Sequence, residues 1–154
     1  MANNVSQEEA MRRISVTTEI NAPAEVVWAQ LTDTATFAEW NPFMPRLTGS
    51  LTVGARIEVR ITPPGAKGMT FRPTVTAAEE NRKLEWLGRF LVPGLFDGRH
   101  TFTLTPTATG CTLVQEETFT GVLVGLMSST LAKTEAGFRQ MNEALKTRAE
   151  RAAA

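Results

Sequence analysis

His100 is the single histidine of the chain, so any proton chemistry near neutral pH starts with it. An imidazole can act there as an acid or as a base. Alternating apolar residues predict two strands joined by a turn at 106–110. If both apolar rows face the same side, Leu104 lies opposite Leu113. His100 then lies opposite Glu117, which predicts an imidazole beside a carboxylate on the inner face of a sheet.

This pair is open to several interpretations. A bulge at Gly110 would shift the pairing by one residue, because glycine bulges are common after such turns. With the register intact, His100 and Glu117 form either a structural hydrogen bond, a polar anchor in an apolar pocket, or an acid–base catalyst. A buried polar group without a partner costs about 1–3 kcal/mol. Two polar groups on an inner row therefore require each other, water or a cavity.

Two connecting segments are unusually apolar. The segment Trp40–Pro45 reads WNPFMP, and Leu91–Gly98 reads LVPGLFDG. Because loops are normally polar, these segments indicate pocket walls or a partner surface, or small cores packed against the end of the sheet. On the predicted inner face, Trp86, Phe90 and Phe119 are candidate wall residues, with plain core packing as the alternative.

The hydrophobic periodicity predicts an α+β domain. Period-2 alternation predicts strands with one buried face, typical of an antiparallel sheet, in 14–20, 57–61, 71–77, 84–86, 99–104 and 113–119. Helical spacing predicts a short helix over Ala24–Thr32 and a long one from about Val122 to Arg148. One apolar stripe runs along the long helix, through Met127, Leu131, Thr134, Phe138, Met141 and Leu145.

Composition excludes several classes of function. Lys and Arg (16) balance Asp and Glu (16), whereas a nucleic-acid-binding surface or a polybasic membrane patch needs a cationic surplus. One histidine and one cysteine cannot build a zinc site by themselves or close a disulfide within the chain. We expect no metal, no cofactor and no nucleic-acid partner. No apolar run reaches the roughly 20 residues of a membrane span.

The length of 154 residues fits a single domain over 1–154. We expect its core at about 12–148, with flexible ends. The polar start of the chain has no apolar run of the kind that a secretory signal needs, so we expect a cytoplasmic protein. An exposed edge strand could pair with a second copy, which leaves monomer and homodimer open.

Three stretches resemble a known family. They are Asn21–Phe43, with NAPAEVVW and WNPF, Leu84–Leu104, and Glu116–Leu126. Together they resemble the START-like, helix-grip (SRPBCC) superfamily, in particular its polyketide cyclase/dehydrase and lipid-transport group. The resemblance implies a curved seven-stranded antiparallel sheet wrapped on a long C-terminal helix, with two short helices after the first strand. It also implies a cavity between sheet and helix that holds small apolar ligands in many members.

We therefore expect a binding protein for a small, largely apolar ligand. One alternative is a polyketide cyclase or dehydratase in which His100 is the acid or base and Glu117 orients it. Another is an interaction module similar to the chaperone-activator branch of the superfamily. The predicted ligand-binding residues are Trp40, Asn41, Phe43, Trp86, Phe90, Phe96, His100, Phe102, Gln115, Glu117, Phe119, Met127, Leu131 and Phe138.

Overall fold

The structure is a computed structural model that describes residues 11–90, 92 and 94–154, with Phe90 described by its backbone alone. The described residues form eight strands, three α-helices and two 3-10 helices. The strands are β1 Met11–Ile20, β2 Arg46–Thr48, β3 Glu58–Ile61, β4 Met69–Phe71, β5 Thr74–Glu79, β6 Lys83–Phe90, β7 Phe96–Pro106 and β8 Cys111–Thr120. The helical elements are α2 Ala24–Thr32, η1 Thr34–Thr36, α3 Phe37–Trp40, η2 Val124–Leu126 and α4 Ser128–Ala153.

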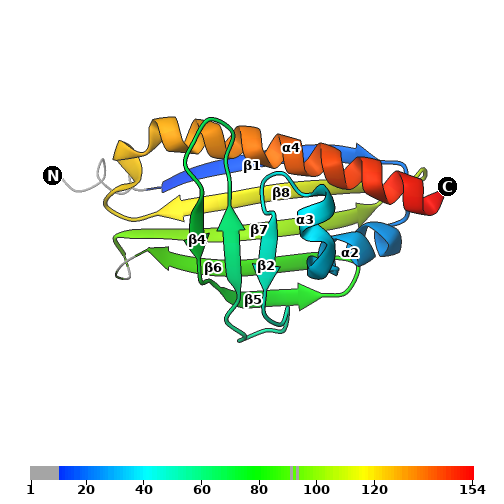
Figure 1. Ribbon diagram of the computed structural model, residues 1–154, viewed down its shortest axis with the longest axis horizontal. Coiled ribbons are helices and arrows are strands. Elements are labelled where there is room, and N and C mark those ends of the chain that lie inside the picture. The colour runs from blue at the N-terminus through cyan, green and yellow to red at the C-terminus, as the bar shows by residue number, and fades with distance from the viewer. Residues whose placement is uncertain (1–10, 91, 93) are drawn as a thin grey trace, which may run out of the picture.

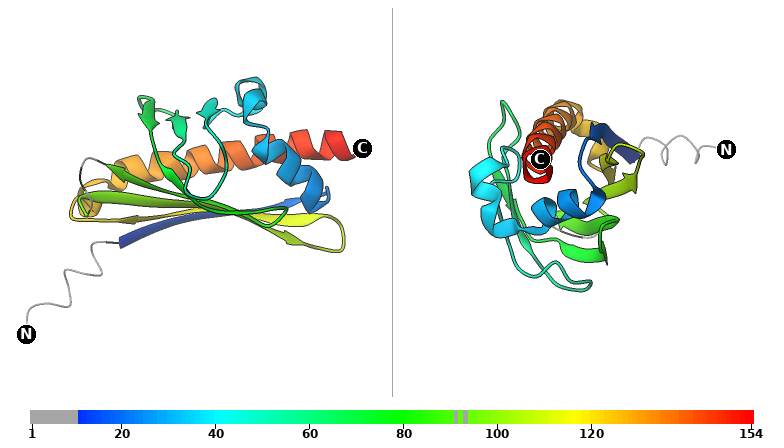
Figure 2. Two further views of the ribbon diagram at one scale, coloured as in Figure 1. Left: turned by 90° about the horizontal axis from the view of Figure 1, so that it is seen from below. Right: turned by 90° about the vertical axis from the view of Figure 1, so that its right-hand side faces the viewer.

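The strands form two antiparallel sheets. The main sheet has the order β1-β8-β7-β6-β5, and the small sheet has the order β2-β3-β4. Figure 1 shows α4 running along the main sheet, with the small sheet crossing the main strands steeply. Figure 2 shows α4 and the small sheet on the same side of the main sheet, which curves around the helix. This is the predicted α+β helix-grip architecture, with α2 and α3 as the two short helices after β1.

The strand number differs from the expected seven in one sheet. Among the described residues, five strands pair in the main sheet and three in the small one. The predicted strand over 71–77 is divided between β4 and β5, because Pro73 separates them and lacks a backbone N–H for strand pairing. Backbone hydrogen bonds still join the two sheets: Ile57 N donates to Pro73 O (2.9 Å) and Val75 N donates to Ala55 O (2.9 Å).

The long helix is shifted from its predicted bounds. It begins at Ser128 rather than near Val122, after the separate 3-10 turn η2. Gly121 has a positive φ of 125°, so the chain turns there instead of continuing into a helix. At the other end the helix extends past Arg148 to Ala153, because the alanines after it are strong helix formers.

The core lies between the inner face of the main sheet and α4. Strand β1 buries every second residue from Ile14 to Ile20, as its alternation predicts. From α4, Phe138, Met141 and Leu145 are fully buried against it. Burial of such side chains stabilises the fold by about 1.5–3 kcal/mol each. No helix in the described part of the chain is both long enough and apolar enough to cross a membrane.

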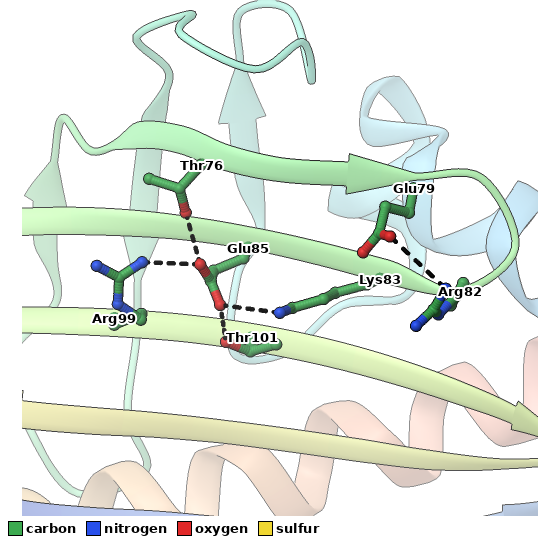
Figure 3. A network of polar contacts seen from close by, with 7 residues as sticks. All are labelled: Thr76, Glu79, Arg82, Lys83, Glu85, Arg99 and Thr101. Atoms are coloured by element: carbon green, nitrogen blue, oxygen red, sulfur yellow. Dashed lines mark hydrogen bonds and ion pairs between the residues drawn. The ribbon is translucent and has the colours of Figure 1, made fainter.

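The outer face of the main sheet carries a network of ion pairs around Glu85 (Figure 3). Its carboxylate accepts hydrogen bonds from Thr76 (2.9 Å), Arg99 (2.8 Å) and Thr101 (3.0 Å), and the Lys83 ammonium lies 3.6 Å away. Burial by itself raises the pKa of Glu85. The three hydrogen bonds and the charge of Lys83 outweigh burial, so the pKa lies below its ordinary value.

Candidate functional site

A cavity of about 220 Å³ lies between the main sheet, the small sheet and the first half of α4. Most of its lining side chains are apolar, and the volume is just below the roughly 300–1,000 Å³ typical of small-molecule sites. Met69 of β4 is 43% exposed, and Thr130 of α4 is exposed, so these two residues lie at its rim. The lining comprises Phe43, Val59, Ile61, Met69, Phe71, Pro73, Trp86, Gly88, Phe96, Gly98, His100, Glu117, Phe119, Leu123, Met127, Thr130, Leu131 and Thr134.

Two glycines of the main sheet, Gly88 and Gly98, line the floor of the cavity, which is the side formed by the main sheet. Gly88 of β6 pairs with Gly98 of β7, which pairs with Phe119 of β8. A Cβ atom on Gly98 would lie 2.5 Å from Oε1 of Glu117, so the carboxylate occupies the space that a side chain would take. A Cβ on Gly88 would meet only ordinary contacts, the nearest being Cβ of Pro73 at 3.7 Å. Gly98 is therefore required for the position of Glu117, and Gly88 is not.

His100 and Glu117 form the polar end of the cavity. They are opposite each other in the β7–β8 ladder, as the alternation predicts and without the shift that a bulge at Gly110 would cause. Nδ1 of His100 lies 3.2 Å from Oε2 of Glu117. The imidazole is 3% exposed and the carboxylate 17% exposed. The carboxylate is thus the more accessible member of the pair.

Behind the imidazole, a chain of buried amides continues away from the cavity. Nε2 of His100 lies 3.0 Å from Oε1 of Gln115, whose Nε2 donates to Oδ1 of Asn142 at 2.7 Å. Nδ2 of Asn142 donates to the backbone carbonyl of Val16 (3.2 Å) and to Oγ1 of Thr18 (3.1 Å). Gln115 and Asn142 are completely buried. Hydrogen bonds thus connect Glu117 to β1 through β7, β8 and α4.

Aromatic rings hold the imidazole and line the walls. Trp86 stacks on His100 with ring centroids 5.2 Å apart and planes at 20°. Phe138 meets His100 edge-on, with ring centroids 5.0 Å apart. Phe96 and Phe119 stack on each other at 5.5 Å. A flat ligand would therefore meet ring faces and edges, the geometry that aromatic groups prefer.

The structure brings eight of the predicted ligand-binding residues to the cavity wall. They are Phe43, Trp86, Phe96, His100, Glu117, Phe119, Met127 and Leu131. Five other predicted residues do not line it: Trp40, Asn41, Phe102, Gln115 and Phe138. The side chain of Phe90, and positions 91 and 93 of the second apolar segment, lie outside what the structure describes.

The five residues off the wall have packing roles. Trp40 packs edge-on against Phe37 at 5.3 Å, and Oδ1 of Asn41 accepts hydrogen bonds from the backbone N–H of Phe43 and of Met44. The apolar segment Trp40–Pro45, one of the expected pocket walls, is therefore a folded turn that contributes Phe43 alone to the cavity wall. Phe102, Gln115 and Phe138 are fully buried and surround His100 from behind.

Sequence reasoning missed the roof of the cavity and the amide chain. The roof comes from the small sheet through Val59, Ile61, Met69 and Phe71, and the alternation over 57–61 could have indicated half of it. The other missed wall positions are Pro73, Gly88, Gly98, Leu123, Thr130 and Thr134. A glycine inside a strand signals close approach of another group, which Gly98 fits. Asn142 lies beside the apolar stripe of the last helix, next to Met141 and four residues after Phe138, and a polar residue at that position was its signal.

The cavity can accommodate an apolar molecule, and the His100–Glu117 pair at its polar end can exchange a proton. The described residues contain no group of three or more His, Cys, Asp or Glu side chains that could hold a metal ion. Cys111 is fully buried on β8 and does not line the cavity. Among the described side chains that line the cavity, His100 and Glu117 are the two that can ionise.

Sequence comparison assigns the family. Residues 11–150 match the family described as polyketide cyclase / dehydrase and lipid transport. The chain belongs to this family. A search of curated protein sequences finds no match to the chain.

Solved structures show the same fold. Protein MLL2253 from Mesorhizobium loti is 26% identical with a TM-score of 0.71, and the match covers 91% of this chain and 98% of that one. The aromatase/cyclase Zhui from Streptomyces sp. R1128 is 18% identical with a TM-score of 0.73, covering 92% and 94%. The di-domain ARO/CYC StfQ of the steffimycin biosynthetic pathway is 16% identical with a TM-score of 0.68. That match covers 93% of this chain but 53% of StfQ.

Proposed function

We propose that this member of the family binds a small, flat, largely apolar molecule in the cavity, with the polar end of the ligand at Glu117. The observation that carries the proposal is the contrast within the cavity, whose wall is mostly apolar and aromatic while its polar end is a single His–Glu pair. Burying apolar ligand surface there is favourable by about 25 cal/mol per Å². The pair at the end fixes the orientation of the ligand.

A polyketide-like aromatic molecule is the ligand class that fits best. The family description and the names of Zhui and StfQ point in this direction. The stacked Phe96–Phe119 pair and Trp86 offer flat surfaces suited to fused rings. The small volume favours one or two rings over a large polycycle unless the ligand extends past the rim at Met69 and Thr130.

A second candidate function is a cyclase or dehydratase reaction on such a ligand. One observation favours it: Glu117 lies within the cavity and contacts His100 at 3.2 Å, so the two groups can pass a proton between them. In such a reaction the pair would take a proton from the ligand or give one to a departing hydroxyl. Loss of turnover in His100→Gln, with the ligand still bound, would support the enzyme; full turnover in that variant would exclude it.

The binding test uses a ring placed inside or outside the cavity. Thr134→Phe adds a ring at the wall, whereas Lys133→Phe adds the same ring at an exposed neighbouring position that does not line the cavity. With 2-naphthol as the probe in calorimetry, we expect Thr134→Phe to weaken binding at least about tenfold, because filled space excludes the ligand. Lys133→Phe should leave the affinity unchanged. Equal affinity in both variants, or no binding to the unmodified chain, would contradict the proposal.

A further inference from the structure

The orientation of the two buried amides, Gln115 and Asn142, is fixed at the end of the chain that contacts β1. Nδ2 of Asn142 lies 3.2 Å from the backbone carbonyl oxygen of Val16, which can only accept a hydrogen bond. The amide of Asn142 must therefore turn its NH₂ group toward β1. Its oxygen, Oδ1, then faces Gln115 at 2.7 Å.

The orientation of the Gln115 amide determines which nitrogen of His100 carries a proton. An amide oxygen accepts only, so Oδ1 of Asn142 requires the NH₂ group of Gln115. The backbone carbonyl of Phe138, 3.5 Å from Nε2 of Gln115, makes the same demand from a second position. The oxygen of Gln115 consequently faces Nε2 of His100 at 3.0 Å, and this nitrogen must carry a proton to donate to it.

The contact between Nδ1 of His100 and Oε2 of Glu117 requires a second proton. With a proton on Nε2, a neutral imidazole presents a bare lone pair at Nδ1. Oε2 of a Glu117 carboxylate lies 3.2 Å from that lone pair, and two acceptors do not bond. The contact forms when a proton lies between the two atoms, either on Nδ1 as an imidazolium or on Oε2 as a carboxylic acid. In both forms the other oxygen, Oε1, remains an acceptor.

We propose that the Val16 carbonyl, acting through Asn142 and Gln115, keeps the proton of His100 on Nε2 and holds a second proton between His100 and Glu117. Glu117 Oε1, over Gly98 on the cavity floor, then receives hydrogen bonds and gives none. The ligand group at this end is accordingly a donor, such as a phenolic or enolic hydroxyl, rather than a carbonyl or an ether oxygen. This statement about the ligand rests on the proposed function; Asn142 and Gln115 are positioning residues.

The proton positions can be measured directly, because the chain has one histidine. Long-range ¹H–¹⁵N spectra of uniformly ¹⁵N-labelled protein at neutral pH distinguish the two neutral tautomers and the imidazolium without further assignment. We expect a protonated Nε2, with Nδ1 either protonated or hydrogen-bonded to a carboxylic acid. A neutral ring with its proton on Nδ1 and a bare Nε2 would overturn the proposal without any variant being made.

Two substitutions test where the direction comes from. Asn142→Leu removes the amide that contacts the Val16 carbonyl and leaves Gln115 only its longer contact with the Phe138 carbonyl (3.5 Å). Gln115 is then held less firmly, and we expect the Nδ1-protonated neutral tautomer to become populated. Thr18→Val is the matched control, since it removes a contact of Asn142 with a hydroxyl that can donate or accept, and leaves the carbonyl contact in place. The control should keep the spectrum of the unmodified protein. An unchanged spectrum in Asn142→Leu, or a tautomer change in Thr18→Val, would refute the relay.

The donor requirement is tested with a matched pair of probes. 2-Naphthol and 2-methoxynaphthalene share the ring system, but only the first can donate a hydrogen bond. We expect 2-naphthol to bind about tenfold more tightly, because the ether leaves Oε1 without a donor. Equal or tighter binding of the ether would overturn the donor assignment. If neither probe bound, the proposed function would fail instead, while the spectra would still decide the direction of the chain.

Discussion

At the scale of single residues, the position of the Glu117 carboxylate depends on the absence of a side chain at Gly98. Oε1 of Glu117 lies 2.5 Å from the position that a Cβ on Gly98 would take, which is too close for both atoms to stay in place. Because the same carboxylate contacts His100 through its other oxygen, a displacement of Glu117 would also lengthen the contact between the pair. The geometry of the polar end of the cavity thus depends on position 98 having no side chain.

We predict that Gly98→Ala disturbs the site while Gly88→Ala does not. The new methyl group at Gly98 would lie 2.5 Å from the carboxylate oxygen, whereas at Gly88 the nearest side-chain atom would be 3.7 Å away. In calorimetry with 2-naphthol, Gly98→Ala should lose about tenfold in affinity, the value of one good hydrogen bond. Gly88→Ala should stay within about threefold. The reverse order of the two variants would contradict the assignment of Glu117 as the anchor.

The candidate pair could be predicted from sequence, but its connections could not. Period-2 alternation sets the register of β7 and β8, so His100 and Glu117 follow from a pattern within one hairpin. Asn142 lies on a helix far along the chain, and its contact with Val16 depends on how α4 is rotated over β1. That rotation is fixed by packing across the whole core, which no local pattern specifies.

At the scale of elements, α4 packs directly on the turn that follows α3. Gly137 lies where a Cβ would overlap the ring of Phe43, so the helix approaches this ring as closely as its backbone permits. Phe138, the next residue, meets Phe43 edge-on at 5.5 Å. The pair of positions fixes the helix against one end of the cavity.

We predict that Gly137→Ala destabilises the protein although alanine is the better helix former. The helix preference favours the substitution by about 1 kcal/mol, but overpacking against Phe43 costs about 1–3 kcal/mol. The thermal midpoint, followed by circular dichroism, should fall by about 2–4 °C. Gly125→Ala is the control, because a Cβ there meets nothing within 4 Å. A higher thermal midpoint for Gly137→Ala than for Gly125→Ala would show that the Phe43 ring moves aside at little cost, which would contradict the prediction.

Glu85, on the outer face of the main sheet, gives a prediction for how the stability of the fold depends on pH. The pKa of Glu85 lies below its ordinary value: burial raises it, but the hydrogen bonds from Thr76, Arg99 and Thr101 lower it more. The stabilisation from a carboxylate of this kind is complete above the ordinary pKa and is lost as the pH falls through the lowered one. Urea titrations of Glu85→Gln and the unmodified chain should therefore differ most near neutral pH and converge as the pH falls through the lowered pKa of Glu85. A gap that widens in acid would contradict this sign.

The elements themselves were largely predictable, and their grouping was not. Helix α2 has the predicted bounds, and β1 buries the predicted row. The division of 71–77 between two sheets depends on Pro73, whose carbonyl accepts a hydrogen bond from Ile57 across the junction. A proline signals a break in strand pairing, but not which partner each half will take.

At the scale of the whole molecule, Cys111 reports on unfolding. It is fully buried, and burial raises the pKa of its thiol, with smaller contributions in the same direction from Glu19 and Glu25. Thiol reagents attack the thiolate, so both access and ionisation protect the folded chain. The single-domain organisation and the choice between monomer and homodimer remain predictions.

We predict that Cys111 in the folded protein reacts with a thiol reagent at least about a hundredfold more slowly than in denaturant. The rate, read from reagent absorbance, should fall further with saturating 2-naphthol, because a ligand that binds only the folded state stabilises it. Lys133→Phe should respond to the probe like the unmodified chain, and Thr134→Phe should respond less. Equal rates in native buffer and in denaturant would contradict the burial of this thiol.

The roof and the floor of the cavity come from separate stretches of chain. Residues 58–71 supply Val59, Ile61, Met69 and Phe71, and none of these belongs to the hydrogen-bond chain that runs from Glu117 to Val16. If the proposed function is correct, the part of ligand selection that depends on the roof is encoded separately from the His–Glu pair. Substitutions in residues 58–71 would then change which molecules fit the cavity while the hydrogen-bond chain from Glu117 to Val16 stays in place.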